Sequence, residues 1–160
     1  MRTGVRIGID VGKARIGVAR TDLHGMLATP VETVARSAEG ATADLERIRA
    51  IAAELDAFEY VVGLPLAMSG GETASTADAR DFAERLAASG GLPVRMIDER
   101  LTTVSAQSAL HKSGRNTRSS RPVIDQVAAV ILVQHALDSE RASGRPPGTL
   151  IEPTRGIGSD

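Results

Sequence analysis

The stretch VRIGIDVGKARIGVARTD, Val5 to Asp22, decides how the rest of the sequence is interpreted. Its two short apolar runs, Val5–Val11 and Ile16–Ala19, flank a tight connection that contains glycine, which is the pattern of a β-hairpin. Asp10 interrupts the first run. Burying an acidic side chain in an apolar strand is costly unless a cation compensates the charge. We therefore expect an arginine or a metal ion opposite Asp10.

Length and composition define the class of protein. A chain of 160 residues has room for one domain with one core. The net charge of −1 excludes a globally basic nucleic-acid binder but not a local basic patch, and the absence of cysteine excludes a disulfide framework, a thiolate metal site and a cysteine nucleophile. No apolar run approaches the roughly 18 residues of a membrane span, and no signal peptide is evident. We expect a cytoplasmic protein without a membrane partner.

Hydrophobic periodicity outlines the remaining elements. A third strand is expected at Met26–Val34, where Pro30 favours an edge position. Further strands are expected at Glu59–Leu64 and Leu92–Ile97, and helices at Ala41–Leu55, Ala77–Ala88, from Thr102 or Thr103 to His111, and at Val123–Arg141. This order predicts an α/β fold whose mixed sheet has three antiparallel strands first, a parallel remainder and helices on both faces. Residues 1–147 are expected to form the single domain and residues 148–160 a flexible tail.

Carboxylates occur at three places where an ordinary core would have none. Asp10 lies inside the first strand, Asp98 and Glu99 follow the last predicted strand, and Asp125 lies one turn into the most apolar helix. Carboxylate oxygens without cysteine or clustered histidine are typical ligands of Mg²⁺ or Mn²⁺. Two such ions, about 3.5–4 Å apart, activate a water and stabilise the leaving oxygen in phosphodiester hydrolysis. The pattern favours a metal site built from separate elements.

Each of these residues also has an ordinary explanation. Asp10 is equally well paired with Lys13 or Arg15. The triplet Asp98-Glu99-Arg100 is more often a charged turn. Asp125 near a helix N-terminus is favourable through the helix dipole whatever its function. The pattern alone therefore leaves both explanations open.

Four ordered motifs resemble the YqgF/RuvX family of bacterial RNase H-like nucleases over nearly the whole chain. They are GIDVGKARIGVA (Gly8–Ala19), VVGLPLAMSGGE (Val61–Glu72), DERLTT (Asp98–Thr103) and IDQVAAVIL (Ile124–Leu132). The resemblance implies an RNase H-like fold. It also implies catalytic and metal-binding carboxylates at Asp10, Glu99 and Asp125, with Asp98 as a further candidate ligand, and two Mg²⁺ or Mn²⁺ ions.

The resemblance also suggests what the protein does. The family is associated with maturation of the 5′ end of small-subunit ribosomal RNA, on precursor particles, and resembles RuvC-type Holliday-junction resolvases. Those resolvases carry a further acidic residue on the last helix, whereas the residues one turn after Asp125 in this chain are Ala128 and Ala129, which are not acidic. A resolvase is expected to be a homodimer with two active sites, while an RNA-trimming enzyme can be a monomer. Structured RNA and branched DNA remain alternative substrates.

Several residues outside the acidic set are candidates for contact with nucleic acid. A Gly-rich loop with Ser69, Gly70 and Gly71 is suited to phosphate binding through backbone N–H groups. Basic or polar candidates near the carboxylates are Lys13, Arg15, Arg100, Thr102, Lys112, Arg115, Arg118 and Arg121. The near absence of aromatic residues, 2% of the chain, argues against base stacking and predicts binding through the phosphate backbone.

Three functions compete at this point. The first is a metal-dependent nuclease. The second is a phosphotransferase, because GIDVGKARIG also resembles the first phosphate loop of actin-like ATPases and sugar kinases, although 160 residues cannot supply the two lobes that enclose a nucleotide. The third is a non-catalytic module that binds RNA or the ribosome. Loss of cleavage on replacing Asp10 would support the first.

Overall fold

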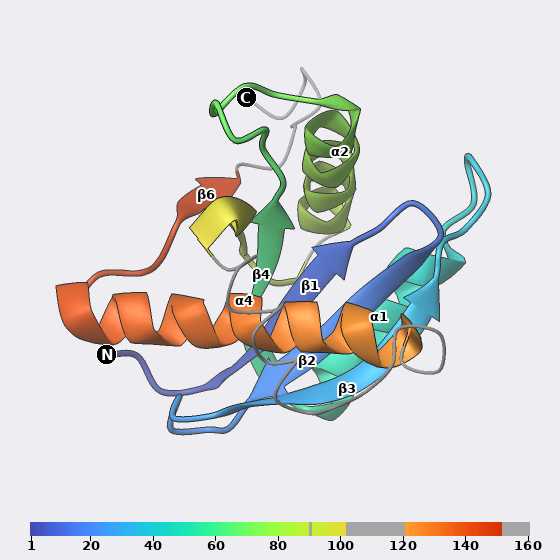
Figure 1. Cartoon of the computed structure of the whole chain (residues 1–160). Helices are drawn as coiled ribbons and strands as arrows, with labels where there is room; N and C mark the ends of the chain where they lie inside the picture. Colours follow the sequence, from blue (N-terminus) through green and yellow to red (C-terminus); the bar gives the residue numbers. More distant parts are fainter. Residues whose placement is uncertain (90, 102–120, 152–160) are drawn as a thin grey trace, which may run out of the picture.

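The computed structural model describes residues 1–89, 91–101 and 121–151 and contains a six-stranded mixed sheet with the order β3-β2-β1-β4-β5-β6 (Figure 1). The strands are β1 (Val5–Val11), β2 (Arg15–Thr21), β3 (Ala28–Ala35), β4 (Ala57–Leu64), β5 (Val94–Asp98) and β6 (Thr149–Ile151). The helices are α1 (Ala43–Glu54), α2 (Ala74–Ala88) and α4 (Arg121–Ser143), with a short 3₁₀ turn at Glu99–Leu101. No described helix is long and apolar enough to cross a bilayer.

The expected order of strands is confirmed. β1, β2 and β3 form an antiparallel meander, and β4 and β5 continue the sheet in parallel on the other side of β1. β3 is an edge strand, as Pro30 indicates, because proline cannot donate to a second neighbour. β1 therefore lies in the middle of the sheet and carries Asp10 near its carboxyl end.

The chain after α4 differs from expectation. Thr149–Ile151 form β6, which pairs antiparallel with β5, where the sequence indicates a frayed tail. A strand of three residues is too short to show a periodic pattern, and the pairing depends on the free edge of β5. Residues 152–160 and the helix expected from Thr102 or Thr103 to His111 lie outside the described residues.

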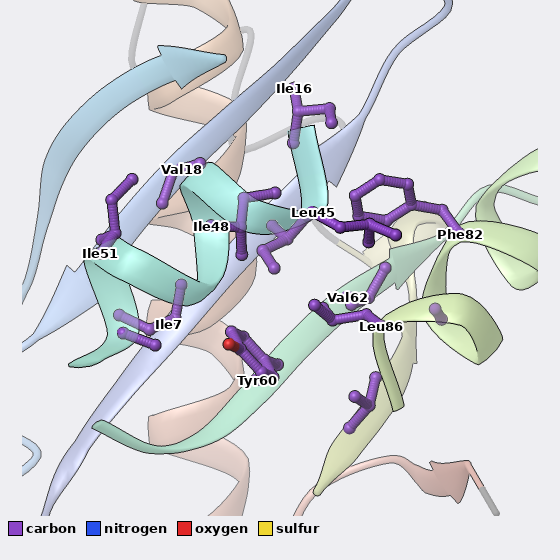
Figure 2. Packing of buried hydrophobic residues seen from close by; sticks show 14 of the residues in the cluster. Ile7, Ile16, Val18, Leu45, Ile48, Ile51, Tyr60, Val62, Phe82 and Leu86 are labelled. Atoms are coloured by element: carbon purple, nitrogen blue, oxygen red, sulfur yellow. The ribbon is translucent and has the colours of Figure 1, made fainter. Parts of the chain in front are cut away.

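Alternation along the strands gives the sheet two different faces. On the first face, the apolar side chains of the strands pack against α1 and α2, around Ile48, Phe82 and Leu86 (Figure 2). On the second face, α4 crosses the sheet over a smaller core that includes Val61, Ala129 and Val133. Helices on both faces of the sheet confirm the expected layering.

Glycines allow α4 to lie unusually close to β1 and β2. A Cβ on Gly8 would lie 2.7 Å from the Val133 Cβ, and a Cβ on Gly17 would collide with the backbone carbonyl of Asp125. Real Cβ atoms essentially never come this close to another heavy atom, so only glycine at positions 8 and 17 permits the close packing of α4 on the two strands. The close packing fixes the depth at which the N-terminal part of α4 lies over the sheet.

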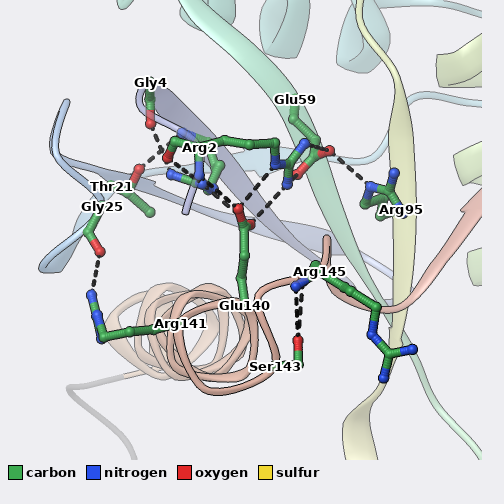
Figure 3. A network of polar contacts seen from close by, with 11 residues as sticks. Arg2, Gly4, Thr21, Gly25, Glu59, Arg95, Glu140, Arg141, Ser143 and Arg145 are labelled. Carbon is green, nitrogen blue, oxygen red and sulfur yellow. Dashed lines mark hydrogen bonds and ion pairs between the residues drawn. The ribbon is translucent and has the colours of Figure 1, made fainter.

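The other end of α4 is held by buried ion pairs (Figure 3). Glu140, only 1% exposed, accepts hydrogen bonds from Arg2 at 2.8 Å and from the buried Arg6 at 3.2 Å. Arg2 also donates to Glu59 of β4, which Arg95 of β5 contacts at 2.9 Å. Buried carboxylates of this kind require such partners. The network joins the N-terminus, the sheet and α4 at the end of the sheet remote from Asp10.

Candidate active site

Asp10 and Glu99 meet at the carboxyl ends of the parallel strands. Asp10 is the penultimate residue of β1, and Glu99 is the first residue after β5. Burial raises the pKa of the Glu99 carboxyl group to about 9, and its hydrogen bond with Asp10 and the negative charge of Asp10 act in the same direction. Both effects of Asp10 disfavour the ionised form of Glu99. In the metal-free protein Glu99 therefore keeps its proton at neutral pH.

Two glycines make room for this pair. Gly17 of β2 is the register partner of Asp10, and Gly63 of β4 lies on the same face of the sheet. A Cβ on Gly63 would collide with the Glu99 carboxylate and would lie 2.7 Å from its Cγ. The absence of side chains on both sides of Asp10 therefore opens the space that Glu99 and α4 use.

Asp125 approaches the same region from α4. Its backbone carbonyl lies over Gly17, directly across from Asp10 in the sheet register. Its carboxylate accepts a hydrogen bond from Nε of Arg15 at 2.8 Å, and the two side chains are 22% and 38% exposed, respectively. Arg15 is thus the partner of Asp125, whereas the partner of Asp10 is Glu99. The expected alternative in which Arg15 pairs with Asp10 is therefore wrong, because Arg15 pairs with Asp125.

Asp98 has a different environment from Glu99. Alternation places it on the face of Val94 and Met96. Hydrogen bonds from Arg100, the shortest at 2.6 Å, hold the pKa of the Asp98 carboxyl group below its usual value. Asp98 therefore forms an ion pair with Arg100 in this structure.

The donor set fits a divalent metal ion in its chemistry. Asp10 and Glu99 offer oxygen ligands, and a cation would replace the proton of the Glu99 carboxyl group, as expected of a site for a hard ion such as Mg²⁺ or Mn²⁺. Among the described residues no group of three or more acidic or histidine side chains is close enough to hold a metal. The carboxylate of Asp125 is instead paired with Arg15.

Comparison with known proteins assigns the chain to a family. A family model described as "RuvX: Holliday junction resolvase" matches residues 4–139. The chain belongs to the RuvX family. It is 63% identical over 156 residues to a protein of Leifsonia xyli named "Putative pre-16S rRNA nuclease", covering 98% of this chain and 99% of the relative. A protein of the same name from Clavibacter michiganensis is 62% identical and covers 97% of this chain and 96% of that relative.

A solved structure confirms the RNase H-like fold of this RuvX-family chain. The structure is that of Thermus thermophilus RuvC in complex with a Holliday junction substrate. It matches with a TM-score of 0.55 over 90% of this chain and 99% of that chain, at 18% identity. At this identity the likeness concerns the fold alone, and the sequence-based expectation of an RNase H-like sheet is confirmed.

The RuvX-family chain presents the Gly-rich loop beside Arg100. Arg100 contacts the Met68 carbonyl at 3.3 Å, and its Nη1 lies close to Gly70. Several N–H groups of the loop are already used, because Ala67 donates to the Gly71 carbonyl and Gly70 to the Ala67 carbonyl. Gly71 donates to the Ser69 hydroxyl. The N–H groups of Ala67, Gly70 and Gly71 are therefore used within the loop, and phosphate binding by this loop stays a prediction.

The remaining candidates for nucleic-acid contact are distributed as follows. Lys13 is exposed in the turn between β1 and β2, two residues before Arg15. Arg121 begins α4. Thr102, Lys112, Arg115 and Arg118 lie outside the described residues.

The roles of Gly17 and Gly63 were not predicted from the sequence. Gly63 belongs to β4, and both residues act by having no side chain. A signal was present: in a strand, a glycine that faces a lone carboxylate marks a place where another group approaches the backbone. This signal can be recognised only when the register between β1 and β2 is known, because the register shows that Gly17 lies opposite Asp10.

Proposed function

We propose that this protein is a divalent-metal-dependent nuclease in which Asp10, Glu99 and Asp125 hold the metal. The observation that carries the proposal is the hydrogen-bonded Asp10–Glu99 pair at the carboxyl ends of parallel strands, with Asp125 above it on α4. Ligand sites of open α/β sheets lie at this edge. Membership of the RuvX family supports phosphodiester hydrolysis as the reaction.

The residues of this chain have distinct roles in that reaction. Asp10 and Glu99 bind the metal with a dense negative charge, and Gly17 and Gly63 keep the space above Asp10 open. When bound, Mg²⁺ or Mn²⁺ polarises the phosphodiester and lowers the pKa of the attacking water. Arg100, whose guanidinium donates hydrogen bonds to Asp98, would bind a phosphate of the nucleic-acid backbone.

For the substrate, we infer precursor 16S ribosomal RNA, with the enzyme acting in maturation of its 5′ end. The relatives that are more than 60% identical carry a pre-16S rRNA nuclease name and align over nearly their whole length. A four-way DNA junction is the second candidate, favoured by the description of the family and by the fold shared with RuvC. A junction resolvase would act as a dimer, whereas RNA trimming requires no partner copy.

A cleavage assay tests this proposal. A precursor 16S rRNA fragment and a four-way DNA junction are each incubated with Mg²⁺ or Mn²⁺ and with wild type or Asp10→Asn. We expect wild type to cut the RNA and Asp10→Asn to be inactive but folded, as judged by its circular dichroism and thermal melt. Symmetric nicking of the junction alone would make the protein a resolvase. Metal-independent binding without cleavage of either substrate would favour a non-catalytic RNA- or ribosome-binding module.

The matched control is an acidic residue of the same chain that lies away from the site. Asp138 is an exposed residue of α4, paired with Arg141 three residues further on. Asp138→Asn removes the same charge as Asp125→Asn and should keep full activity. Equal loss of activity in both variants would indicate a general charge effect and would contradict the assignment of Asp125.

A further inference from the structure

The ion pair between Arg15 and Asp125 joins two groups that the reaction needs separately. Arg15 is the first residue of β2, and Asp125 lies in the N-terminal part of α4, 110 positions later. The contact is a single hydrogen bond, from Nε to Oδ2 at 2.8 Å. The two terminal guanidinium nitrogens of Arg15 have no hydrogen-bond partner among the described residues.

We propose that Arg15 is an exchangeable counter-ion: it holds the Asp125 carboxylate in the metal-free protein, is displaced by the divalent cation, and then binds the backbone phosphate of the substrate. This inference rests on the proposed function and adds to it how the site couples metal binding to substrate binding. No bond other than hydrogen bonds and metal–oxygen contacts is made or broken.

The geometry favours exchange over a permanent structural pair. Both side chains are partly exposed, and partly exposed single-point ion pairs contribute little to stability. The pairs that hold the molecule together are different, because Glu59 and Glu140 are almost fully buried and each accepts several hydrogen bonds from arginines. A divalent cation beside Asp10 would carry twice the charge of the guanidinium, so Asp125 would favour the cation over Arg15.

A phosphate of the nucleic-acid backbone is the second partner that we infer for the displaced guanidinium of Arg15. Its planar fork matches a phosphate oxygen pair, and it is always charged. Arg15 follows the exposed turn that carries Lys13, so a phosphate approaching Arg15 also approaches a second cation. The same residue thus stabilises the site without metal and the substrate when metal is present.

The first test measures Mn²⁺ binding alone, by isothermal titration calorimetry, without nucleic acid. We expect Arg15→Gln to bind Mn²⁺ about three- to fivefold more tightly than wild type, since it removes a competitor of modest strength. The matched control is Lys13→Gln, which removes one positive charge two residues before Arg15 without breaking the Asp125 pair. Equal Mn²⁺ affinities of Arg15→Gln and Lys13→Gln would overturn the exchange.

The second test measures nucleic-acid binding with Mn²⁺ present, by fluorescence anisotropy read before cleavage accumulates. The probes are the precursor 16S rRNA fragment and the four-way DNA junction. For the probe that binds, we expect Arg15→Gln to bind more weakly than wild type. The slope of log affinity against log salt should become less steep by about one, as for one lost phosphate contact. An unchanged slope would show that Arg15 does not reach the phosphate and would overturn this half of the proposal.

Two further variants keep the outcomes distinguishable. If Arg15→Gln does not fold, Arg15→Lys replaces it and should show a smaller gain in Mn²⁺ affinity, because lysine keeps the charge but lacks the planar fork. Asp10→Asn should lose Mn²⁺ binding. If it binds Mn²⁺ like wild type, the proposed metal site itself fails; if it loses binding while Arg15→Gln matches Lys13→Gln, only the exchange fails.

Discussion

Glu99 connects the chemistry of the site to the stability of the metal-free fold. Its pKa is raised to about 9 in the folded protein, mainly by burial and then by Asp10, from an ordinary value of 4.5. Between these values the folded state binds a proton that the unfolded state has released. The free energy of unfolding therefore falls as the pH rises through this window.

This linkage gives a measurable pH dependence. In the presence of a chelator, the melting temperature of wild type should fall relative to that of Glu99→Gln as the pH rises from about 5 to about 8. Glutamine keeps a hydrogen-bonding group near Asp10 but does not titrate. Thermal melts at matched ionic strength provide the measurement, and parallel curves for the two proteins would contradict a raised pKa for Glu99.

Gly63 provides a test of the space beside Asp10. A Cβ at this position would collide with the carboxylate end of Glu99, which is a flexible side chain that can move. Gly63→Ala should therefore displace Glu99, weaken Mn²⁺ binding by tenfold or more, about 1.4 kcal/mol or greater, and change the free energy of unfolding by less. Mn²⁺ titration and urea unfolding of the same sample separate the two effects; unchanged Mn²⁺ affinity would show that Glu99 does not depend on this space.

At the scale of elements, the packing of α4 on the β1–β2 hairpin sets the position of Asp125. The Asp125 carbonyl occupies the space where Gly17 would carry a side chain, so α4 and β2 are in backbone contact. Packing at this density does not absorb an added methyl group without a shift of the backbone.

Gly17→Ala should consequently be more damaging than Gly63→Ala. We expect the free energy of unfolding to fall by about 1–3 kcal/mol or more, because the backbone of α4 must shift, whereas a side chain could move more easily. Cleavage should fall as well, since Asp125 moves with α4. Gly71→Ala is the matched control: its φ is not positive and its nearest neighbour, the Ser69 hydroxyl, is 3.5 Å away. Equal stability of Gly17→Ala and Gly71→Ala in urea unfolding would contradict the close packing of α4.

The capping of α2 illustrates how an element boundary departs from its periodic pattern. The helix begins at Ala74, three residues before the expected Ala77, because Thr73 and Thr76 form reciprocal side-chain-to-backbone hydrogen bonds. Such capping is local chemistry, but a threonine at the third helical position replaces the usual glutamate or glutamine. The polar first turn therefore has the composition of a loop.

At the scale of the whole molecule, α4 is fixed at both ends by different means. Asp125 lies over Gly17 at the end where the candidate site is, and Glu140 is bound by Arg2 and Arg6 at the other end. Burial alone would raise the pKa of the Glu140 carboxyl group, but hydrogen bonds from Arg2 lower it to about 2. The charged form of Glu140 is therefore strongly favoured in the folded protein.

Removing this carboxylate should destabilise the whole fold. Glu140→Ala leaves the buried Arg6 without a counter-charge and removes one of the two carboxylates that bind Arg2, which costs about 3–5 kcal/mol. Because the pKa of Glu140 is lowered by folding, its contribution is present above about pH 4.5 and is lost as the pH falls towards 2. Urea unfolding should show the difference between wild type and Glu140→Ala shrinking in acid. The exposed Asp138→Asn on the same helix should change stability little.

Most of the elements, the layers and the family could be predicted from the sequence. Apolar runs and their periodicity are local properties, so they identified the hairpin around Asp10 and the helix that carries Asp125. The missing N–H of Pro30 is also local and indicated the edge strand. The four motifs predicted the RuvX family, and the family match confirms it. The candidate carboxylates were selected at this level as well, because an acidic residue in an apolar run is unusual wherever it lies.

Which charged groups contact one another depends on the tertiary structure. It paired Asp10 with Glu99 and Arg15 with Asp125, directed Asp98 towards Arg100, and gave Glu140 a structural role. The Asp10–Glu99 and Arg15–Asp125 pairs each join residues that are far apart in the sequence. Which residues pair depends on strand register and on how deeply α4 lies over Gly17. No local pattern encodes that depth, because it is the absence of a side chain on one element that admits the backbone of another.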